Sequence, residues 1–382
     1  MPDSRTQKLA RLLVEHSTRV KENEQVAIMG WPEALPLMEA AYEAVLERGG
    51  NPVLLLDYAL NDEILLKKGS TAQLEYVSPI HRLAFETLDA ILKIRSQSNT
   101  RLLSGVDPQK QAVRQTTNSK LLQAQMTRGA TGALKWVTTQ FPTNAYAQDA
   151  DMSLREYEDF VYGACHLNGE DDPVAYWRKV EAEQQRLVDY LKGKKQIRVK
   201  SAGCDLTLSI EGRAFLNAAG QHNMPDGEIY TGPVEDSVNG WVRFSYPGVA
   251  QGREVDGVEF GFENGRVIRA SARKNQDYLL KTLDTDPGAR YLGEFAIGTN
   301  FGVTRHTKNI LFDEKIGGTI HMAVGAGYPE TGSKNTSAVH WDLLCDMRSG
   351  GEIWVDGELF YQNGEFKRGL LVSRRRAASR TL

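Results

Sequence analysis

The chain has 382 residues, of which 41% are hydrophobic, as is normal for a soluble globular protein of about two domains. Its formal net charge is −3, so no overall positive field favours nucleic acid as a partner. The cluster Arg374, Arg375, Arg376 and Arg380 is typical of a solvated terminal segment. We expect a cytoplasmic protein that binds neither nucleic acid nor membranes, because we find no apolar span or signal core, and its three cysteines are widely spaced.

The first half of the chain alternates predicted helices and strands. Leu9, Leu12 and Leu13 have the spacing of an amphipathic helix that begins near Ser4. Strands are expected at residues 25–29, 52–56, 89–94 and 134–138, and helices at 33–48 and 108–128. The apolar strand 52–56 favours a parallel sheet that is covered on both faces. Since no GxGxxG motif follows these strands, we predict an open, largely parallel α/β domain that is not a dinucleotide fold, over residues 1–193.

The character of the chain changes near residue 193. A capping box at Ser153 predicts a helix that runs towards Cys165, and a second helix is expected over residues 174–191. Residues 192–196 have the composition of a linker, which places the domain boundary there. Short alternating segments follow, with hairpin-turn signals at Asp256-Gly257, Asn264-Gly265, Asp356-Gly357 and Asn363-Gly364. We therefore predict an α+β, β-rich domain of antiparallel strands over residues 194–382.

Metal-ligand chemistry is concentrated late in this second domain. A single stretch holds Glu314, His321, Tyr328, His340 and Asp342, although the whole chain has only seven histidines. His340 and Asp342 are two residues apart on a predicted strand, so their side chains project to the same side. Mixed nitrogen and oxygen ligands suit zinc, cobalt or manganese. Either histidine taken alone is as readily a hydrogen-bonded structural residue, but the neighbouring acids favour a metal site.

Two earlier acids stand out by their context. Glu228 directly follows a Pro/Gly turn, at the start of a predicted strand. Glu294 lies inside an otherwise apolar strand, where a buried carboxylate is costly unless a cation or hydrogen bonds compensate it. The alternatives are a surface acid for Glu228 and an arginine-paired acid for Glu294.

Several ordered motifs resemble those of the thermophilic aminopeptidase family, the aminopeptidase T family of metallopeptidases. They are GQHNMPDGEIYTGP, RYLGEFAIGTN, DEKIGGTIHMAVGAGYPETG and SAVHWDL. The resemblance is dense over about residues 213–366 and looser in the first half. It implies a metal-dependent aminopeptidase that releases N-terminal residues from peptides with a free N-terminus through a metal-activated water. It also implies a homodimer.

The same resemblance assigns the site residues. It implies a pair of divalent metal ions (zinc, cobalt or manganese) held by Glu228, Glu294, Glu314, His321, His340 and Asp342, with Glu294 as the bridge. Glu314 and His321 are spaced more widely than in the best-known members, and the interval from His321 to His340 is shorter. Tyr328 matches a tyrosine near the metals, and its phenol would stabilise the oxyanion, unless it is an ordinary core tyrosine. The substrate amine would bind a metal or an acid such as Glu235 or Asp236.

Other classes of protein remain as alternatives. The chain has no HExxH motif and no GxSxG elbow, which excludes a single-zinc peptidase of that kind and argues against a serine hydrolase. A ring-cleaving dioxygenase on the same scaffold would hold one ferrous iron with His321, His340 and Asp342. Glu228 and Glu294 favour the peptidase, because a mononuclear iron site needs no bridging acid. A non-catalytic metal-binding or peptide-binding protein is the third possibility.

Overall fold

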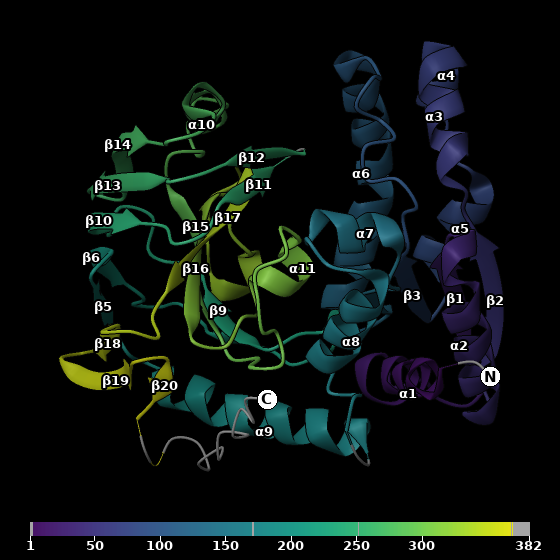
Figure 1. The fold of residues 1–382 in the computed structure, drawn as a ribbon, viewed down its shortest axis with the longest axis horizontal. Coiled ribbons are helices and arrows are strands. Elements are labelled where there is room, and N and C mark those ends of the chain that lie inside the picture. The colour runs from purple at the N-terminus through teal and green to yellow at the C-terminus, as the bar shows by residue number, and fades with distance from the viewer. Residues whose placement is uncertain (1–2, 170–171, 251, 368, 370–382) are drawn as a thin grey trace. The chain divides into compact units, whose positions relative to one another are not determined.

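The computed structural model describes residues 3–169, 172–250, 252–367 and 369 (Figure 1). The arginine-rich segment near the C-terminus lies outside these described residues. Within them, no helix combines the length and the apolar composition that crossing a membrane requires.

Contacts divide the chain into two compact units. The first comprises Met1–Trp177 and Gly220–Asp226, and the second comprises Arg178–Ala219 and Gly227–Leu382. The division falls inside helix α9 (Pro173–Leu191), earlier in the chain than the boundary predicted after Gly193. The reason is packing, because Leu187 and Leu191 of α9 belong to the hydrophobic core of the second unit.

The first unit is built on a five-stranded parallel sheet in the order β2-β1-β3-β4-β8. Its strands are β1 (Gln25–Gly30), β2 (Asn51–Leu56), β3 (Ala90–Arg95), β4 (Lys135–Gln140) and β8 (Asn223–Met224). Its helices are α1 (Ser4–Leu12), η1 (Leu13–Ser17), η2 (Pro32–Ala34), α2 (Leu35–Glu47), α3 (Ala59–Lys68), α4 (Thr71–Leu74), α5 (Pro79–Thr87), α6 (Pro108–Ala130), α7 (Asn144–Asp149) and α8 (Leu154–Ala164). The predicted capping box is present at Ser153, whose side chain accepts a hydrogen bond from the backbone of Glu156.

Strand β2 departs from the prediction. It pairs in parallel with β1 as expected, but it is the edge strand of its sheet. Val53, Leu54 and Leu56 are 42%, 39% and 55% exposed, whereas Ala27 on β1 and Ile91 on β3 are fully buried. Cover on both faces was therefore predicted correctly for the inner strands and wrongly for β2.

The second unit is formed by antiparallel strands. These are β5 (Gln196–Ser201), β6 (Cys204–Ser209), β7 (Leu216–Ala218), β9 (Glu228–Thr231), β10 (Asn239–Arg243), β11 (Gly248–Ala250), β12 (Arg253–Val255), β13 (Glu259–Glu263), β14 (Arg266–Ser271), β15 (Leu292–Gly298), β16 (Thr319–Gly325), β17 (His340–Asp346), β18 (Glu352–Val355), β19 (Glu358–Gln362) and β20 (Glu365–Phe366). An eight-stranded sheet, here called the outer sheet, has the order β14-β13-β10-β6-β5-β18-β19-β20. A five-stranded sheet, here called the site sheet, has the order β17-β16-β15-β9-β7, and β11 pairs with β12. The helices of this unit besides α9 are α10 (Gln276–Leu283), α11 (Ile310–Asp313) and η3 (Pro329–Thr331).

Asx-Gly turns close hairpins of the outer sheet, as predicted from the sequence. Asn264-Gly265 joins β13 to β14, Asp356-Gly357 joins β18 to β19, and Asn363-Gly364 joins β19 to β20. Both residues of each turn have positive φ, which a type I′ turn requires. Asp256-Gly257 instead connects β12 to β13, which lie in different sheets, so its hairpin prediction was wrong.

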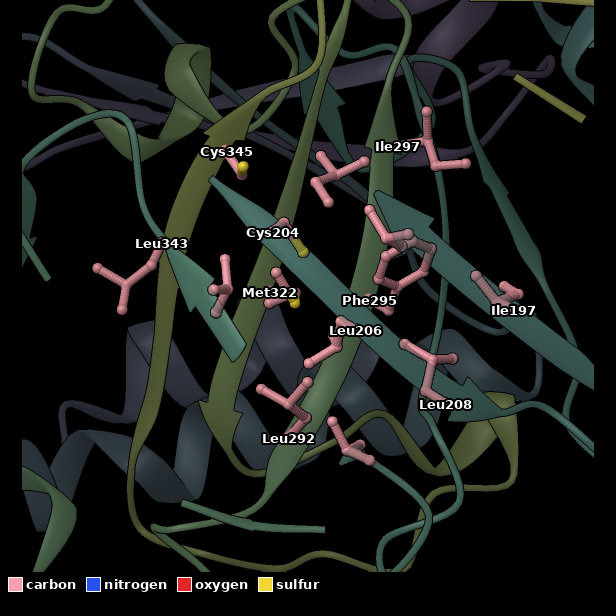
Figure 2. Packing of buried hydrophobic residues seen from close by; sticks show 14 of the residues in the cluster. Ile197, Cys204, Leu206, Leu208, Leu292, Phe295, Ile297, Met322, Leu343 and Cys345 are labelled. Carbon is pink, nitrogen blue, oxygen red and sulfur yellow. The ribbon is translucent and has the colours of Figure 1, made fainter. Parts of the chain in front are cut away.

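The apolar faces of the two large sheets share one hydrophobic core (Figure 2). Cys204, Leu206 and Leu208 of β6 contribute from the outer sheet, and Phe295 and Met322 contribute from the site sheet. Because side chains on a strand alternate, the opposite face of the site sheet is left for other groups.

Candidate metal centre

Five of the predicted ligands project from that opposite face of the site sheet. They are Glu228 on β9, Glu294 on β15, His321 on β16, and His340 and Asp342 on β17. The strand register aligns them, because Ala296 lies opposite His321, Ala323 opposite Asp342, and Gly298 opposite Glu228. These small cross-strand partners leave space between the larger polar side chains.

A β-bulge at Gly293 precedes Glu294. The register of β15 and β16 shifts between Leu292 and Glu294, which is the signature of one extra residue. A Cβ atom at Gly293 would lie 2.0 Å from the carbonyl oxygen of Ala326, so the close approach requires glycine. The bulge thus brings β15 next to the segment that carries Tyr328.

Glu294 lies between the two histidines. Its Oε1 is 3.6 Å from Nε2 of His321, and its Oε2 is 3.4 Å from Nε2 of His340. A further acid approaches the same Nε2 atom of each histidine. Glu228 Oε2 lies 3.4 Å from His321 Nε2, and Asp342 Oδ2 lies 3.5 Å from His340 Nε2.

The ligand atoms form three overlapping groups whose members lie within 4.8 Å of one another. The groups are Glu228, Glu294 and His321; Glu294, His340 and Asp342; and Glu314, His321 and Asp342. Glu294, His321 and Asp342 each belong to two groups, so the whole set is continuous. Glu314, which directly follows α11, is thus close to the other acids despite its unusual sequence spacing.

The donor set fits a divalent cation. Glu228, Glu294 and His321 are 5%, 4% and 1% exposed. Glu228 Oε2 and Asp342 Oδ1 are buried and accept no hydrogen bond in the described part of the chain. A buried polar atom without a partner costs about 1–3 kcal/mol. Carboxylate and imidazole donors around one space are the ligands of zinc and similar ions, and such an ion would satisfy these oxygens.

Burial and mutual charge shift the pKa values of the cluster. Burial raises the pKa of Glu228 to about 8, although the charge of Lys315 opposes this shift. Burial also raises the pKa of Glu294, but the neighbouring imidazoles of His321 and His340 outweigh it and lower the pKa to about 2. For the histidines, burial lowers the pKa, but the acids outweigh it and raise the pKa to about 9 for His321 and about 12 for His340. The acids therefore stabilise positive charge at the centre of the cluster, where a metal ion would carry it.

Tyr328 lies beside this cluster of candidate ligands. Its ring contacts the ring of His340 edge-on, with centroids 5.4 Å apart, and the ring of Tyr230, at 5.3 Å. Its backbone carbonyl accepts a hydrogen bond from Thr331 Oγ1 at 2.7 Å. Burial, followed by the charge of Glu294, raises the pKa of the phenol. The phenol of Tyr328 therefore keeps its proton beside the candidate ligands.

Lys315 is a residue that the sequence analysis missed. Its side chain is 1% exposed, and its Nζ donates a hydrogen bond to Glu228 Oε1 at 2.5 Å and lies 2.8 Å from Glu314 Oε1. It occupies the connection between α11 and β16, where no periodic pattern signals burial.

Gln184 of α9 was also missed. It is 2% exposed, and its amide nitrogen donates to the carbonyl oxygens of Ala218 and Glu228, both at 2.9 Å. Its amide oxygen accepts a hydrogen bond from Thr299 at 2.7 Å. The sequence predicts the helix, but not that one of its many polar residues anchors the backbone of Glu228.

Glu235, one of the acids suggested as a partner for the substrate amine, has internal partners. Its Oε2 pairs with Nη2 of Arg213 at 2.5 Å, and its Oε1 accepts a hydrogen bond from the backbone nitrogen of Lys334 at 2.7 Å. The other suggested acid, Asp236, is exposed. The side chain of Glu235 therefore holds the segment that follows Tyr328 through a hydrogen bond.

The chain is similar to several known proteins over most of its length. The sequence model of the thermophilic metalloprotease family (M29) matches residues 2–366. Aminopeptidase 2 of Geobacillus stearothermophilus is 28% identical over 393 positions, which cover 92% of this chain and 93% of the relative.

Two solved structures have a similar fold. Wild-type AmpT from Thermus thermophilus is 22% identical, with a TM-score of 0.82, over 95% of this chain and 99% of its own. A 2,5-dihydroxypyridine dioxygenase from Pseudomonas putida is 13% identical, with a TM-score of 0.57, over 95% of this chain and 97% of its own. At these identities the likenesses concern the fold, and the first confirms the predicted fold class.

Proposed function

Because this chain belongs to the thermophilic metalloprotease family (M29), and is thus a metal-dependent peptide hydrolase, we propose that it is an aminopeptidase that releases N-terminal residues from peptides. Aminopeptidase 2 and aminopeptidase T of Thermus aquaticus, both similar over 92% of this chain, support this specificity by their names. The observation that carries the proposal is Glu294, a buried carboxylate with one oxygen towards each of two histidines.

The proposed site holds a pair of divalent ions, which we expect to be zinc, cobalt or manganese. Glu228 and His321 would bind one ion, and His340 and Asp342 the other, with Glu294 shared between them. Glu314 would add a further oxygen near His321 and Asp342. Two of the three ligand groups support this division, because they share Glu294 and otherwise separate these residues, whereas the group of Glu314 links His321 with Asp342.

When bound, such ions lower the pKa of a water molecule and polarise the scissile carbonyl. The remaining roles belong to the chain itself. Tyr328 would donate its phenolic proton in a hydrogen bond to the carbonyl oxygen as negative charge develops there. Its raised pKa keeps the phenol protonated for that task. The small residues Ala296 and Ala323 leave the polar face of the site sheet open between the ligands.

The grouping of the ligands argues against the dioxygenase alternative. A mononuclear iron site of the two-histidine, one-carboxylate type needs both imidazoles around one ion. Each of the three groups instead contains a single imidazole together with two carboxylates. The likeness to the dioxygenase therefore reflects a shared fold.

Metal content and peptidase activity test the proposal together. The protein would be purified without added metal, and its metals would be measured by elemental analysis. Release would then be assayed with an unblocked aminoacyl substrate after zinc, cobalt or manganese is restored. We expect about two ions per chain and metal-dependent release, with an N-acetylated substrate left intact. About one iron per chain without release would instead favour the dioxygenase.

We also propose that the protein forms a homodimer through the edge strand β2. An exposed apolar edge strand is a liability that proteins usually cover. Val53 and Leu56 lie on this strand and are 42% and 55% exposed, and a second copy of the chain that pairs with β2 would cover the edge beside them. Light scattering after size-exclusion chromatography should give a dimer mass for the wild type and a monomer mass for Val53→Lys. A wild-type monomer would contradict the proposal.

We further propose that the protein is located in the cytoplasm. Cys165, Cys204 and Cys345 are all buried and form no disulfide, as is usual in reducing compartments. Fractionation of cells that express the tagged protein would test the location.

A further inference from the structure

We propose that Lys315 is a positioning residue of the metal centre, a fixed internal cation that orients Glu228 and Glu314 and stays in place when metal ions bind. This inference rests on the proposed metal site and extends it to a residue that is not a ligand.

The burial of Lys315 requires a specific explanation. Lysine is almost never fully buried unless it is paired, because its charge loses hydration. Its side chain is 1% exposed and meets two acids, Glu228 and Glu314, at 2.5 and 2.8 Å. Each of these acids belongs to a ligand group, and the two groups meet at His321. Lys315 therefore joins two ligands that the metal site also uses.

The division of the carboxylate oxygens lets Lys315 remain in place. Its Nζ contacts Oε1 of Glu228, whereas the Oε2 of this acid lies 3.4 Å from His321 and accepts no hydrogen bond within the described residues. On Glu314 it also contacts Oε1. A metal ion on the histidine side would thus use an oxygen of Glu228 that the ammonium group leaves open.

The backbone of Lys315 is held firmly. Its nitrogen donates a hydrogen bond to the carbonyl oxygen of Phe312 at 3.0 Å, and its own carbonyl accepts one from Asn300 at 3.0 Å. A Cβ atom at Gly298 would lie 2.2 Å from the carbonyl oxygen of Ile316, so this segment packs tightly on β15. The backbone from which the Lys315 side chain extends is therefore fixed, which limits the movement of its ammonium group.

Two opposite effects of Lys315 on metal affinity can be distinguished. Its positive charge repels a metal ion, and its hydrogen bonds hold two ligands in the orientation that binds one. We expect orientation to dominate, since on Glu228 the ammonium group contacts Oε1 and leaves Oε2, the oxygen near His321, open. Groups that orient metal ligands typically change metal affinity by about 10–100-fold.

The test compares Lys315→Met with a matched control, Lys308→Met. Lys308 also pairs with an acid, at 3.6 Å from Glu254, but its side chain is 38% exposed. Each metal-free protein would be titrated with cobalt(II), with binding followed by calorimetry and by the visible absorption of the ion. For Lys315→Met we expect about 10–100-fold weaker binding of at least one ion and an altered spectrum. Lys308→Met should match the wild type in both.

The outcomes separate this inference from the proposed function. Wild-type protein that binds no cobalt would overturn both. Wild-type binding together with equal or tighter binding by Lys315→Met would overturn only the positioning role, and tighter binding would show that Lys315 competes with the metal. Circular dichroism checks the fold of each variant. If Lys315→Met does not fold, Lys315→Gln is tested instead. We expect this variant to bind cobalt(II) about tenfold more weakly than the wild type, because the amide lacks the charge.

Discussion

The two faces of the site sheet are built by the same strands but have opposite chemistry. One face places Phe295, Met322 and Leu343 in the shared core (Figure 2). The other face holds Glu294 and His321, which are buried at a cost in free energy that only a cation or hydrogen bonds can offset. Substitutions of two neighbouring residues on one strand should therefore have different effects, one on function and the other on stability, because their side chains lie on different faces.

The largest effect is expected for Glu294→Gln on the polar face. The amide keeps the size of the side chain but loses the charge that lies between His321 and His340. Hydrolysis should fall below detection and bound metal should decrease, as measured by an aminoacyl release assay and elemental analysis. Thermal unfolding should show a folded protein. Full activity in this variant would exclude Glu294 as the bridge.

Phe295→Ala should have the opposite effects: it should lower stability and leave metal binding unchanged. Phe295 is fully buried and lies opposite Met322 in the strand register. Removal of a buried phenylalanine typically lowers the free energy of unfolding by about 3–5 kcal/mol, because a cavity remains. Urea denaturation would measure this loss, and the metal content of the folded fraction should stay at the wild-type value. An unchanged free energy of unfolding would show that the two faces are not divided as described.

Tyr328→Phe tests a residue that borders the polar face without being a proposed ligand. The ring would keep its contacts with His340 and Tyr230, but the hydroxyl that we propose as a donor to the oxyanion would be lost. Turnover should fall by roughly 10²–10³-fold, as for the loss of one oxyanion donor. The metal content should not change. Equal kcat in mutant and wild type would remove Tyr328 from the reaction.

The common face of the proposed ligands on the site sheet was predictable, because the alternation of side chains along a strand can be read from the sequence. The spacing of His340 and Asp342 predicts a common face, and an acid inside the apolar run around Glu294 predicts a compensating partner. The resemblance to family motifs then led to the proposed set of ligands. Glu314 lies outside the strands, and its place near the other ligands became evident only from the fold.

Other features depend on tertiary contacts that no local pattern records. The sequence does not distinguish an edge strand from a central one, so the exposure of β2 was missed. Strand β8 has two residues and joins its sheet from far along the chain, which leaves no periodicity to detect. Lys315 and Gln184 are long polar side chains whose burial is determined by the acids and carbonyl groups around them.

The segment that carries Tyr328 is anchored from outside the polar face. Arg213 has a side chain only 6% exposed and pairs with Glu235, which in turn accepts hydrogen bonds from Ser333 Oγ at 3.4 Å and from the nitrogen of Lys334 at 2.7 Å. Ser333 packs closely on Gly327, since a Cβ atom there would lie 2.1 Å from its hydroxyl oxygen. The ion pair therefore fixes the turn that presents the phenol.

The smallest effect is accordingly expected for Glu235→Gln. The amide retains an acceptor for Lys334 but leaves the buried guanidinium of Arg213 without its counter-charge, so the turn should shift slightly. We expect kcat to fall by about tenfold or less, with metal content unchanged, because the change acts through the placement of one donor. Glu259→Gln is the matched control, since it breaks an exposed pair with Arg243 that has the same 2.5 Å separation. If Glu235 acts through Tyr328, adding Glu235→Gln to Tyr328→Phe should cost nothing further, whereas additive losses would show that the two residues act independently.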